Sequence, residues 1–229
     1  MKRYVETMKL AVIIGVGDGI GQAVATKFAR AGYQVAMVAR HAEKLEQYSQ
    51  RIQGSGYQAR GYSADAGDPQ SLKETLKQIQ QELGPVDTLV YNAASHHPGE
   101  LVTLSDEAFL EDYRINVLGA FVAVRAVLEG MRTLGGGTVL LTGGGLALRP
   151  QVGLGSLSMG KAGLRGLAFL LAEELRPYNI QVSTITVMGH VSPTTPFSPD
   201  RIADKFWEIH QMPVLPVEVQ MAPDPEPAT

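Results

Sequence analysis

The feature that most constrains the fold of this chain is its opening segment, in which a short apolar run leads through four glycines into a helix. Residues Leu10 to Gly15 (LAVIIG) form a continuous, β-branched stretch, typical of a strand buried on both faces of a parallel sheet. The glycines of GVGDGIG follow, and from Ile20 to Ala31 apolar side chains recur at spacings of three and four residues. The sequence therefore predicts a strand, a glycine-rich turn and a helix, in that order.

The same alternation continues along the chain. Further strands are predicted over residues 35–39, 56–63, 86–91, 137–142, 179–187 and 214–220. Further helices are predicted over residues 42–53, 69–83, 106–134, 155–175 and 199–210. This order predicts a single-domain α/β protein with a Rossmann-like, doubly wound parallel sheet and helices on both faces. We expect the domain to cover residues 9–221, after an N-terminal extension (1–8) and before a disordered, proline-rich tail (222–229).

Composition and charge exclude several classes of function. The 229 residues are 45% hydrophobic and 19% charged, which fits one globular core. The net charge of −3 gives no general attraction for nucleic acid or for an anionic membrane. The chain has no cysteine, so we expect no thiolate chemistry and no metal site, and it has no apolar run long enough for a signal peptide or a membrane span. We therefore expect a cytoplasmic protein that binds a small molecule.

The glycine-rich turn is the first candidate binding site. Its backbone amides can face a pyrophosphate, because no Cβ atoms obstruct them and a helix N-terminus carries a partial positive charge. A purely structural turn would use glycine too, but a position between the first strand and the first helix favours a dinucleotide. The candidate cofactor-binding residues of the turn are Gly15, Gly17, Asp18, Gly19, Ile20 and Gly21.

The spacing of Gly15, Gly19 and Gly21 resembles the GxxxGxG motif of short-chain dehydrogenases/reductases. Other motifs of that family follow in the same order, so that the resemblance spans roughly residues 9–190. The matching positions are Asp65, the run Asn92, Ala93 and Ala94 in place of an NNAG motif, Asn116 and Lys161.

The resemblance implies roles for these residues and an activity for the chain. Asp65 corresponds to an aspartate that contacts the adenine, and Lys161 to a lysine that binds the cofactor ribose and assists catalysis. The implied activity is hydride transfer between a nicotinamide and a small carbonyl, alcohol or imine. The family also implies a homodimer or homotetramer that pairs through the helices at 106–134 and 155–175.

The end of the second strand bears on the choice between NAD and NADP. An NAD site uses a carboxylate there to bind ribose hydroxyls, whereas the 2′-phosphate of NADP needs a cation. The strand ends in Ala39-Arg40, so Arg40 favours NADP, although a solvated surface arginine would give the same sequence. Asp18 argues the other way, because its carboxylate would repel a phosphate. NADP is the predicted cofactor and NAD the alternative.

The catalytic set that the resemblance implies is incomplete. The family combines Asn, Ser, Tyr and Lys, with the tyrosine four residues before the lysine and the serine thirteen residues before the tyrosine. In this chain those positions hold Leu157 and Gly144. Because leucine has no proton to donate, we expect ordinary ketone reduction to be slower by about 10²–10⁴-fold.

Other side chains are candidates for the missing proton donor. His190 follows the sixth strand and His97 follows the fourth, and an imidazole has a suitable pKa. Together with Asn116 and Lys161, these histidines form the candidate catalytic set. Asn116 has an alternative role as a ligand of backbone groups, and Lys161 as a ligand of the ribose alone.

Three hydroxyl groups lie near the missing serine and tyrosine. Ser156 and Ser158 each lie about 100° around the helix from Leu157, so neither projects in the same direction. Thr142 shares a strand face with Gly144 and is a possible source of a hydroxyl.

The sequence leaves several functions open. One is a divergent NADP(H)-dependent oxidoreductase with a non-standard proton donor. Another is a catalytically inactive nucleotide-binding protein that acts as a sensor or as a structural partner of another subunit. A third is a nonredox lyase or isomerase that uses the same pocket.

Overall fold

β1 lies inside a seven-stranded sheet of order β3-β2-β1-β4-β5-β6-β7, in which every strand pairing is parallel. The computed structural model describes residues 8–223. The strands are β1 (Leu10–Ile14), β2 (Gln34–Ala39), β3 (Ala59–Ser63), β4 (Thr88–Tyr91), β5 (Gly137–Gly144), β6 (Ile180–Val187) and β7 (Glu218–Met221). The α-helices are α1 (Ile20–Arg30), α2 (Ala42–Gln53), α3 (Pro69–Leu83), α4 (Asp106–Tyr113), α5 (Gly119–Thr133), α6 (Gly155–Leu175) and α7 (Pro199–His210). The predicted doubly wound α/β fold is confirmed.

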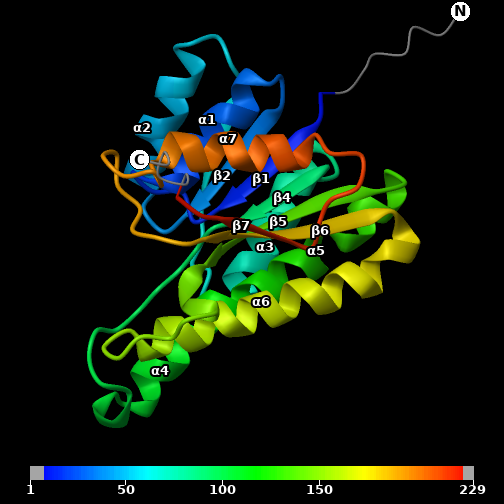
Figure 1. Cartoon of the computed structure of the whole chain (residues 1–229). Helices are drawn as coiled ribbons and strands as arrows, with labels where there is room; N and C mark the ends of the chain where they lie inside the picture. Colours follow the sequence, from blue (N-terminus) through cyan, green and yellow to red (C-terminus); the bar gives the residue numbers. More distant parts are fainter. Residues whose placement is uncertain (1–7, 224–229) are drawn as a thin grey trace, which may run out of the picture.

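Helices cover both faces of the sheet (Figure 1). Successive side chains of β1 point to opposite faces, as the pleat of a strand requires. Leu10, Val12 and Ile14 pack with α3, α5 and α6, whereas Ala11 and Ile13 pack with α1, α2 and α7. Burial on both faces explains why the first strand is apolar throughout.

The strand order reverses direction between β1 and β4, because β2 and β3 lie on one side of β1 and the remaining strands lie on the other. In doubly wound sheets, ligands bind outside the carboxyl ends of the strands at such a switch point. The turns that follow β1 and β4 therefore meet at the place where a ligand is expected.

Three predicted elements differ most from the observed ones, while β4 starts and β5 ends two residues later than predicted. The predicted helix over 106–134 is divided into α4, a π-helical turn η2 (Arg114–Leu118) and α5, because a wider turn interrupts the α-helical ladder. The third strand starts at Ala59 rather than residue 56, since Gly56 has a φ of +85°. The last strand starts at Glu218 rather than residue 214, where pairing with β6 begins.

Short 3₁₀ turns complete the structure: η1 (Leu101–Thr103), η3 (Gly145–Ala147) and η4 (Arg176–Tyr178). The predicted extension (1–8) and tail (222–229) lie almost wholly outside the described residues. Across residues 8–223, no helix combines the length and the apolar character needed to cross a bilayer.

The packing of α7 on α1 places a half-buried histidine among aromatic rings. His210 packs against Phe28, Tyr33 and Trp207, with its ring centroid 5.2–5.6 Å from theirs. His210 Nε2 lies 2.7 Å from the Tyr33 hydroxyl, while Nδ1 is buried without a hydrogen-bond partner among the described residues. Burial, with a smaller contribution from the charge of Lys9, lowers the pKa of His210 to about 4.

The half-buried His210 leads us to expect a loss of folding stability in mild acid. The pKa of His210 is lower in the folded chain than in the unfolded chain, so the unfolded state binds more protons below about pH 6.5. Stability is complete above that pH and falls as the pH approaches 4, by about 1–3 kcal/mol from this group. Urea unfolding of the wild type and of His210→Gln near neutrality and near pH 4.5 measures the contribution. We expect a weaker pH dependence in His210→Gln and no change in His41→Gln, an exposed control; equal slopes in all three proteins would contradict the assignment.

Candidate functional site

A cavity of about 800 Å³ lies at the carboxyl ends of β1, β4, β5 and β6, and we call it the central cavity. The predicted site residues that line it are Gly15, Gly17, Gly19, Ile20, Gly21, Asn92, Ala94, Lys161 and His190. The predicted site residues that do not line it are Asp18, Arg40, Asp65, Ala93, His97 and Asn116. The structure thus brings the glycine turn and Lys161 to one cavity. The residues of the second list lie outside the lining of that cavity.

The glycines of the turn divide into two pairs. Gly15 has a φ of +88°, and a Cβ there would lie 2.3 Å from the backbone nitrogen of Ala93. A Cβ on Gly21 would lie 2.5 Å from the carbonyl oxygen of Gly15. These two glycines are needed for close backbone packing.

Gly17 and Gly19 have a different role. A Cβ at either position would meet no atom within 4 Å, and both residues line the central cavity. Gly19 is also the N-cap of α1 and makes no side-chain cap hydrogen bond. The open space and the uncapped helix N-terminus fit a pyrophosphate in this turn.

A chain of hydrogen bonds joins the glycine turn to α6. Asn92 Nδ2 donates to the carbonyl oxygen of Gly15 over 2.8 Å, and the Thr142 hydroxyl donates to Asn92 Oδ1 over 2.9 Å. Lys161 Nζ then donates to the carbonyl oxygen of Thr142 over 2.7 Å. The Thr142 hydroxyl, a candidate substitute for the missing serine, is therefore engaged with Asn92.

Lys161 is buried at the inner end of this chain. Burial lowers the pKa of Lys161 to about 8, and no carboxylate of the described residues pairs with its ammonium group. The amine therefore remains mostly protonated at neutral pH. Among the described residues, the Thr142 carbonyl oxygen is the one group that accepts a hydrogen bond from it. The free-energy cost of burying this charge falls when hydroxyl groups or an anion bind beside it in the cavity.

The two positions at which the family resemblance implies a serine and a tyrosine, Gly144 and Leu157, both line the central cavity. Leu157 lies one helical turn before Lys161, and Gly144 ends β5. A Cβ on Gly144 would lie 3.6 Å from the carbons of the Lys161 side chain, which is ordinary van der Waals contact. The space for a serine is therefore present although the hydroxyl is absent.

The serines beside Leu157 point away from the cavity. Ser158 Oγ donates to the carbonyl oxygen of Leu154 over 2.8 Å, and Ser156 Oγ donates to Asp112 over 2.5 Å. Both serines are buried, and neither lines the central cavity. They do not replace the tyrosine, as the helical geometry predicted.

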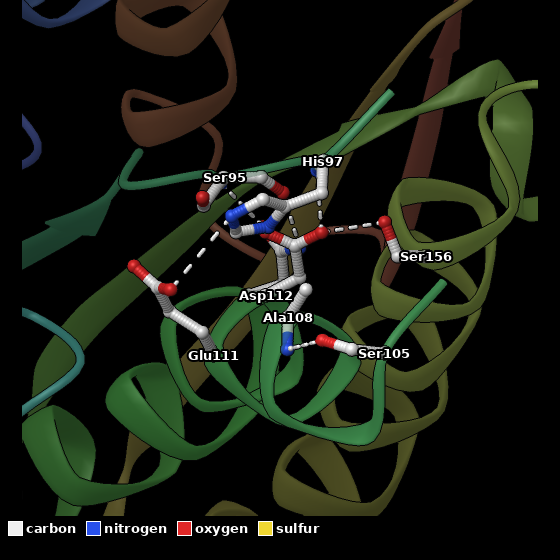
Figure 2. Close-up of polar contacts among 8 residues, drawn as sticks. Ser95, His97, Ser105, Ala108, Glu111, Asp112 and Ser156 are labelled. Atoms are coloured by element: carbon white, nitrogen blue, oxygen red, sulfur yellow. Dashed lines mark hydrogen bonds and ion pairs between the residues drawn. The ribbon is translucent and has the colours of Figure 1, made fainter. Parts of the chain in front are cut away.

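Figure 2 shows where His97 lies. Asp112 accepts hydrogen bonds from the His97 backbone nitrogen over 2.7 Å and from Ser156, and it lies 3.1 Å from His97 Nδ1. Glu111 Oε2 lies 3.8 Å from His97 Nε2. Burial raises the pKa of the Asp112 carboxyl, but these hydrogen bonds outweigh it and lower the pKa overall. The ionised Asp112 anchors the loop after β4 to α4 and α6 and holds His97 outside the central cavity.

Asn116 lies in the π-helical turn η2 and holds the same loop. Its Oδ1 accepts a hydrogen bond from the backbone nitrogen of Ser95 over 3.0 Å, and its Nδ2 donates to the carbonyl oxygen of Ser95 over 2.8 Å. The side chain thus binds backbone groups of the loop that follows β4, not groups of its own helix. Its role in the structure is to position that loop.

The charges near the end of β2 bear on the cofactor. Asp18 accepts a hydrogen bond from the Tyr48 hydroxyl over 2.6 Å and pairs with Lys44 at 3.1 Å, and these contacts lower the pKa of Asp18. Its charge is therefore opposed by a neighbouring cation. Arg40 is exposed at the end of β2 and forms no ion pair within the described part of the chain. Asp65 is also exposed and accepts a hydrogen bond from the Gly67 backbone over 2.8 Å.

Some lining residues were not singled out by the sequence. Leu146, Arg149 and Gln151 come from the connection between β5 and α6, and Val191 follows β6. Their signal is positional, because loops at the carboxyl ends of parallel strands surround the ligand site of a doubly wound sheet. Residue type alone did not mark them.

The fold and the cavity define a doubly wound α/β protein with a dinucleotide-type glycine turn at the switch point of its sheet. Comparison with known proteins agrees with that class. The family model described as short chain dehydrogenase matches residues 9–200. The chain belongs to this family of oxidoreductases, the short-chain dehydrogenases/reductases.

Individual relatives are moderately similar in sequence. The 2,3-dihydro-2,3-dihydroxybenzoate dehydrogenase of Bacillus subtilis is 32% identical over 178 residues, which cover 78% of this chain and 68% of that protein. The human 3-oxoacyl-[acyl-carrier-protein] reductase is 28% identical over 177 residues, covering 77% of this chain and 73% of the relative. Other relatives are matched over 64% of their length.

Solved structures are similar over nearly the whole chain. A metagenomic short-chain oxidoreductase in complex with NADP superposes with a TM-score of 0.86 at 25% identity, covering 94% of this chain and 97% of that one. An alcohol dehydrogenase from Thermococcus sibiricus complexed with 5-hydroxy-NADP gives a TM-score of 0.85 at 27% identity, covering 96% and 99%.

Proposed function

We propose that this chain is an NADP(H)-binding oxidoreductase that transfers a hydride between the nicotinamide and a small carbonyl, alcohol or imine substrate, with Gly144 and Leu157 in place of the usual serine and tyrosine. The proposal rests on the central cavity. It extends from Gly17 and Gly19, where a Cβ would meet no protein atom within 4 Å, to the buried Lys161. The NADP and 5-hydroxy-NADP in the complexes of two structural neighbours support the cofactor.

Every predicted cofactor ligand except Asp18 has a part in this proposal. The amides of the glycine turn (Gly15, Gly17, Gly19, Ile20 and Gly21) bind the pyrophosphate. Asn92 and Ala94 flank it from the end of β4, and Ala93 packs against the backbone of Gly15. Lys161 binds the ribose hydroxyls beside the nicotinamide. Arg40 binds the 2′-phosphate, and Asp65 contacts the adenine. When bound, the reduced nicotinamide supplies the hydride.

The proton has to come from another group. His190 lines the central cavity and is exposed to solvent, so it is suited to protonate a substrate oxygen and to be reprotonated from water. His97 is the second candidate, although its ring lies against Asp112. Asn116 is assigned a positioning role, because it holds the loop after β4.

Oxidation of NADPH in the presence of a panel of aldehydes, ketones and cyclic imines tests the activity. We expect slow turnover with at least one class and a decrease of about 10²-fold or more in His190→Gln, with no comparable loss in His97→Gln. If His97→Gln is the impaired variant, the order of the two histidines is reversed. If no compound in the panel accelerates NADPH oxidation, hydride transfer is excluded for these classes.

Arg40 predicts which coenzyme the chain prefers. Its guanidinium is free within the described residues, and Lys44 opposes the charge of Asp18, so a 2′-phosphate meets net positive charge. We expect Arg40→Gln to weaken NADPH binding about 10-fold or more and to leave NADH binding nearly unchanged. Titrations with both coenzymes measure the ratio, and Lys73→Gln on α3 removes the same charge elsewhere. An unchanged ratio in Arg40→Gln would contradict the assignment.

A catalytically inactive nucleotide-binding protein, acting as a sensor or as a structural partner, is the second candidate. It is favoured by the hydrogen bonds of the three candidate hydroxyls near Leu157 and Gly144, since Thr142, Ser156 and Ser158 are each bonded to another protein group. Tight NADPH binding without oxidation across the substrate panel would identify this function.

We further propose that two copies of the chain pair through α4, α5 and α6, as a homodimer or as part of a homotetramer. These helices carry large exposed apolar side chains, which are Leu110, Tyr113, Phe121, Met159, Phe169 and Leu170. An exposed apolar surface of this kind is typical of an interface between subunits. Sedimentation velocity of the wild type and of Leu170→Glu tests this, and a wild type that sediments as a monomer would exclude it.

A further inference from the structure

Arg149 is a cation of the central cavity for which the proposed cofactor site has no use. It follows η3, and its backbone nitrogen donates to the carbonyl oxygen of Gly145 over 2.9 Å. The next residue, Pro150, restricts the backbone of Arg149 further. Within residues 8–223 the guanidinium makes no ion pair and no hydrogen bond. The backbone of Arg149 is therefore held in place, while the charge of its side chain is available to a ligand.

The charges that line the central cavity have one sign. Lys161 and Arg149 are cations, and His190 becomes one when protonated, whereas no aspartate or glutamate of the described chain lines the cavity. A cationic substrate such as an iminium would be repelled by this lining, and an anionic substrate would be attracted.

The proposed positions of the cofactor phosphates do not account for Arg149. Those phosphates belong to the turn after β1 and to Arg40 after β2, whereas Arg149 follows β5 on the other side of β4. Neighbouring strands are about 4.8 Å apart, so the ends of β1 and β5 are separated by roughly 10 Å. We therefore expect the charge of Arg149 to serve a ligand other than the phosphates of the cofactor.

The residues around Arg149 indicate what that ligand is. Leu146, Leu154 and Leu157 also line the cavity, and like Arg149 they come from the connection after β5 and the start of α6. Apolar side chains beside one free guanidinium suit a molecule with a hydrocarbon body and a single negative group. A guanidinium binds a carboxylate through two parallel N–H···O hydrogen bonds, a geometry that a lysine does not offer.

We propose that Arg149 recognises a carboxylate on the substrate, so that the chain acts on organic acids that also carry the reacting carbonyl or alcohol. The reaction itself rests on the proposed function, but recognition of the carboxylate does not require turnover. Arg149 is therefore a specificity-determining residue at the substrate end of the cavity.

Calorimetric titration of the NADP⁺-saturated protein tests this recognition directly. The probes are butanoate, benzoate and octanoate, each compared with its primary amide, which keeps the shape and lacks the charge. Saturation with NADP⁺ occupies the phosphate positions, so that these cannot bind the probe. We expect at least one carboxylate to bind about 10-fold more tightly than its amide. This preference should disappear in Arg149→Gln, persist in part in Arg149→Lys and be unchanged in Lys73→Gln.

The inference is overturned if no carboxylate binds more tightly than its amide, or if the preference survives in Arg149→Gln. Because Arg149 is exposed, its replacement should leave thermal unfolding unchanged, which separates loss of binding from loss of fold. NADPH oxidation with 4-carboxybenzaldehyde and with 4-methylbenzaldehyde then tests the reaction separately. Carboxylate binding without oxidation would refute hydride transfer and leave the Arg149 site standing. Failure to bind NADP⁺ would refute the proposed function, and the titrations would then use the protein alone.

Discussion

The double variant Gly144→Ser, Leu157→Tyr is expected to reduce simple ketones about 10²–10⁴-fold faster than the parent chain, which is the gain that a positioned general acid provides. The change at 157 places a phenol one helical turn before Lys161, where the lysine charge lowers the pKa of the phenol. The phenol can then donate its proton to the carbonyl oxygen of the substrate. The Cβ introduced at 144 makes only ordinary van der Waals contact, because it lies 3.6 Å from the nearest Lys161 carbons.

The two single variants serve as controls for this result. Leu157→Tyr alone should recover part of the rate, because it supplies the proton, whereas Gly144→Ser alone should recover almost none. NADPH oxidation with a series of ketones measures all four proteins. If the double variant binds NADPH as the parent does and still reduces no ketone, the cavity differs from a ketone reductase site in more than its acid.

Replacement of the open glycines by alanine is expected to remove cofactor binding without harming the fold. Gly17→Ala and Gly19→Ala each add a Cβ that touches no protein atom and projects where the pyrophosphate is proposed to lie. We expect NADPH affinity to fall about 100-fold or more, since a methyl group denies the phosphate its hydrogen bonds to the backbone. The melting temperature of Gly17→Ala without cofactor should be unchanged or slightly raised, because alanine loses less conformational entropy on folding than glycine.

Two other glycines provide contrasting controls. Gly15→Ala requires a φ of +88° and a contact of 2.3 Å with Ala93, so it should destabilise the fold itself. Gly166→Ala, on the face of α6 that carries Phe169 and Leu170, adds a Cβ with no atom of the same chain within 4 Å and should leave coenzyme binding unchanged. Calorimetric titration and thermal melting measure both quantities. Wild-type affinity in Gly17→Ala and Gly19→Ala would show that the phosphates lie elsewhere.

The elements with strong local signals could be predicted from the sequence to within a residue. α3 and α7 begin where Asp68-Pro69 and Ser198-Pro199 combine a capping side chain with a proline in the first turn, and both caps are present in the structure. The glycine turn could be recognised from its position between the first strand and the first helix, and Lys161 from its match to the lysine of the family. The structure brings both to one cavity.

Contacts between distant residues could not be predicted. Asp18 appeared unfavourable for NADP because its partners lie 26 and 30 residues further along the chain. The Tyr48 hydroxyl donates a hydrogen bond to its carboxylate, and the Lys44 ammonium opposes its charge. The bond between His97 and Asp112 joins residues on two elements and draws a candidate acid away from the cavity. Arg149 carried no motif, and only the fold shows that it lines the same cavity as Leu157. Side-chain direction, set by tertiary packing, decided each of these cases.

We infer that the nicotinamide dinucleotide binds in a site that ends at Lys161, beside a leucine instead of a proton donor. Calorimetric titration of the wild-type chain with NADPH and with NADH is the decisive experiment. We expect NADPH to bind with a Kd in the micromolar range, about −8 kcal/mol, and NADH to bind at least about 10-fold more weakly. If neither coenzyme produces a heat of binding, the cavity is not a dinucleotide site.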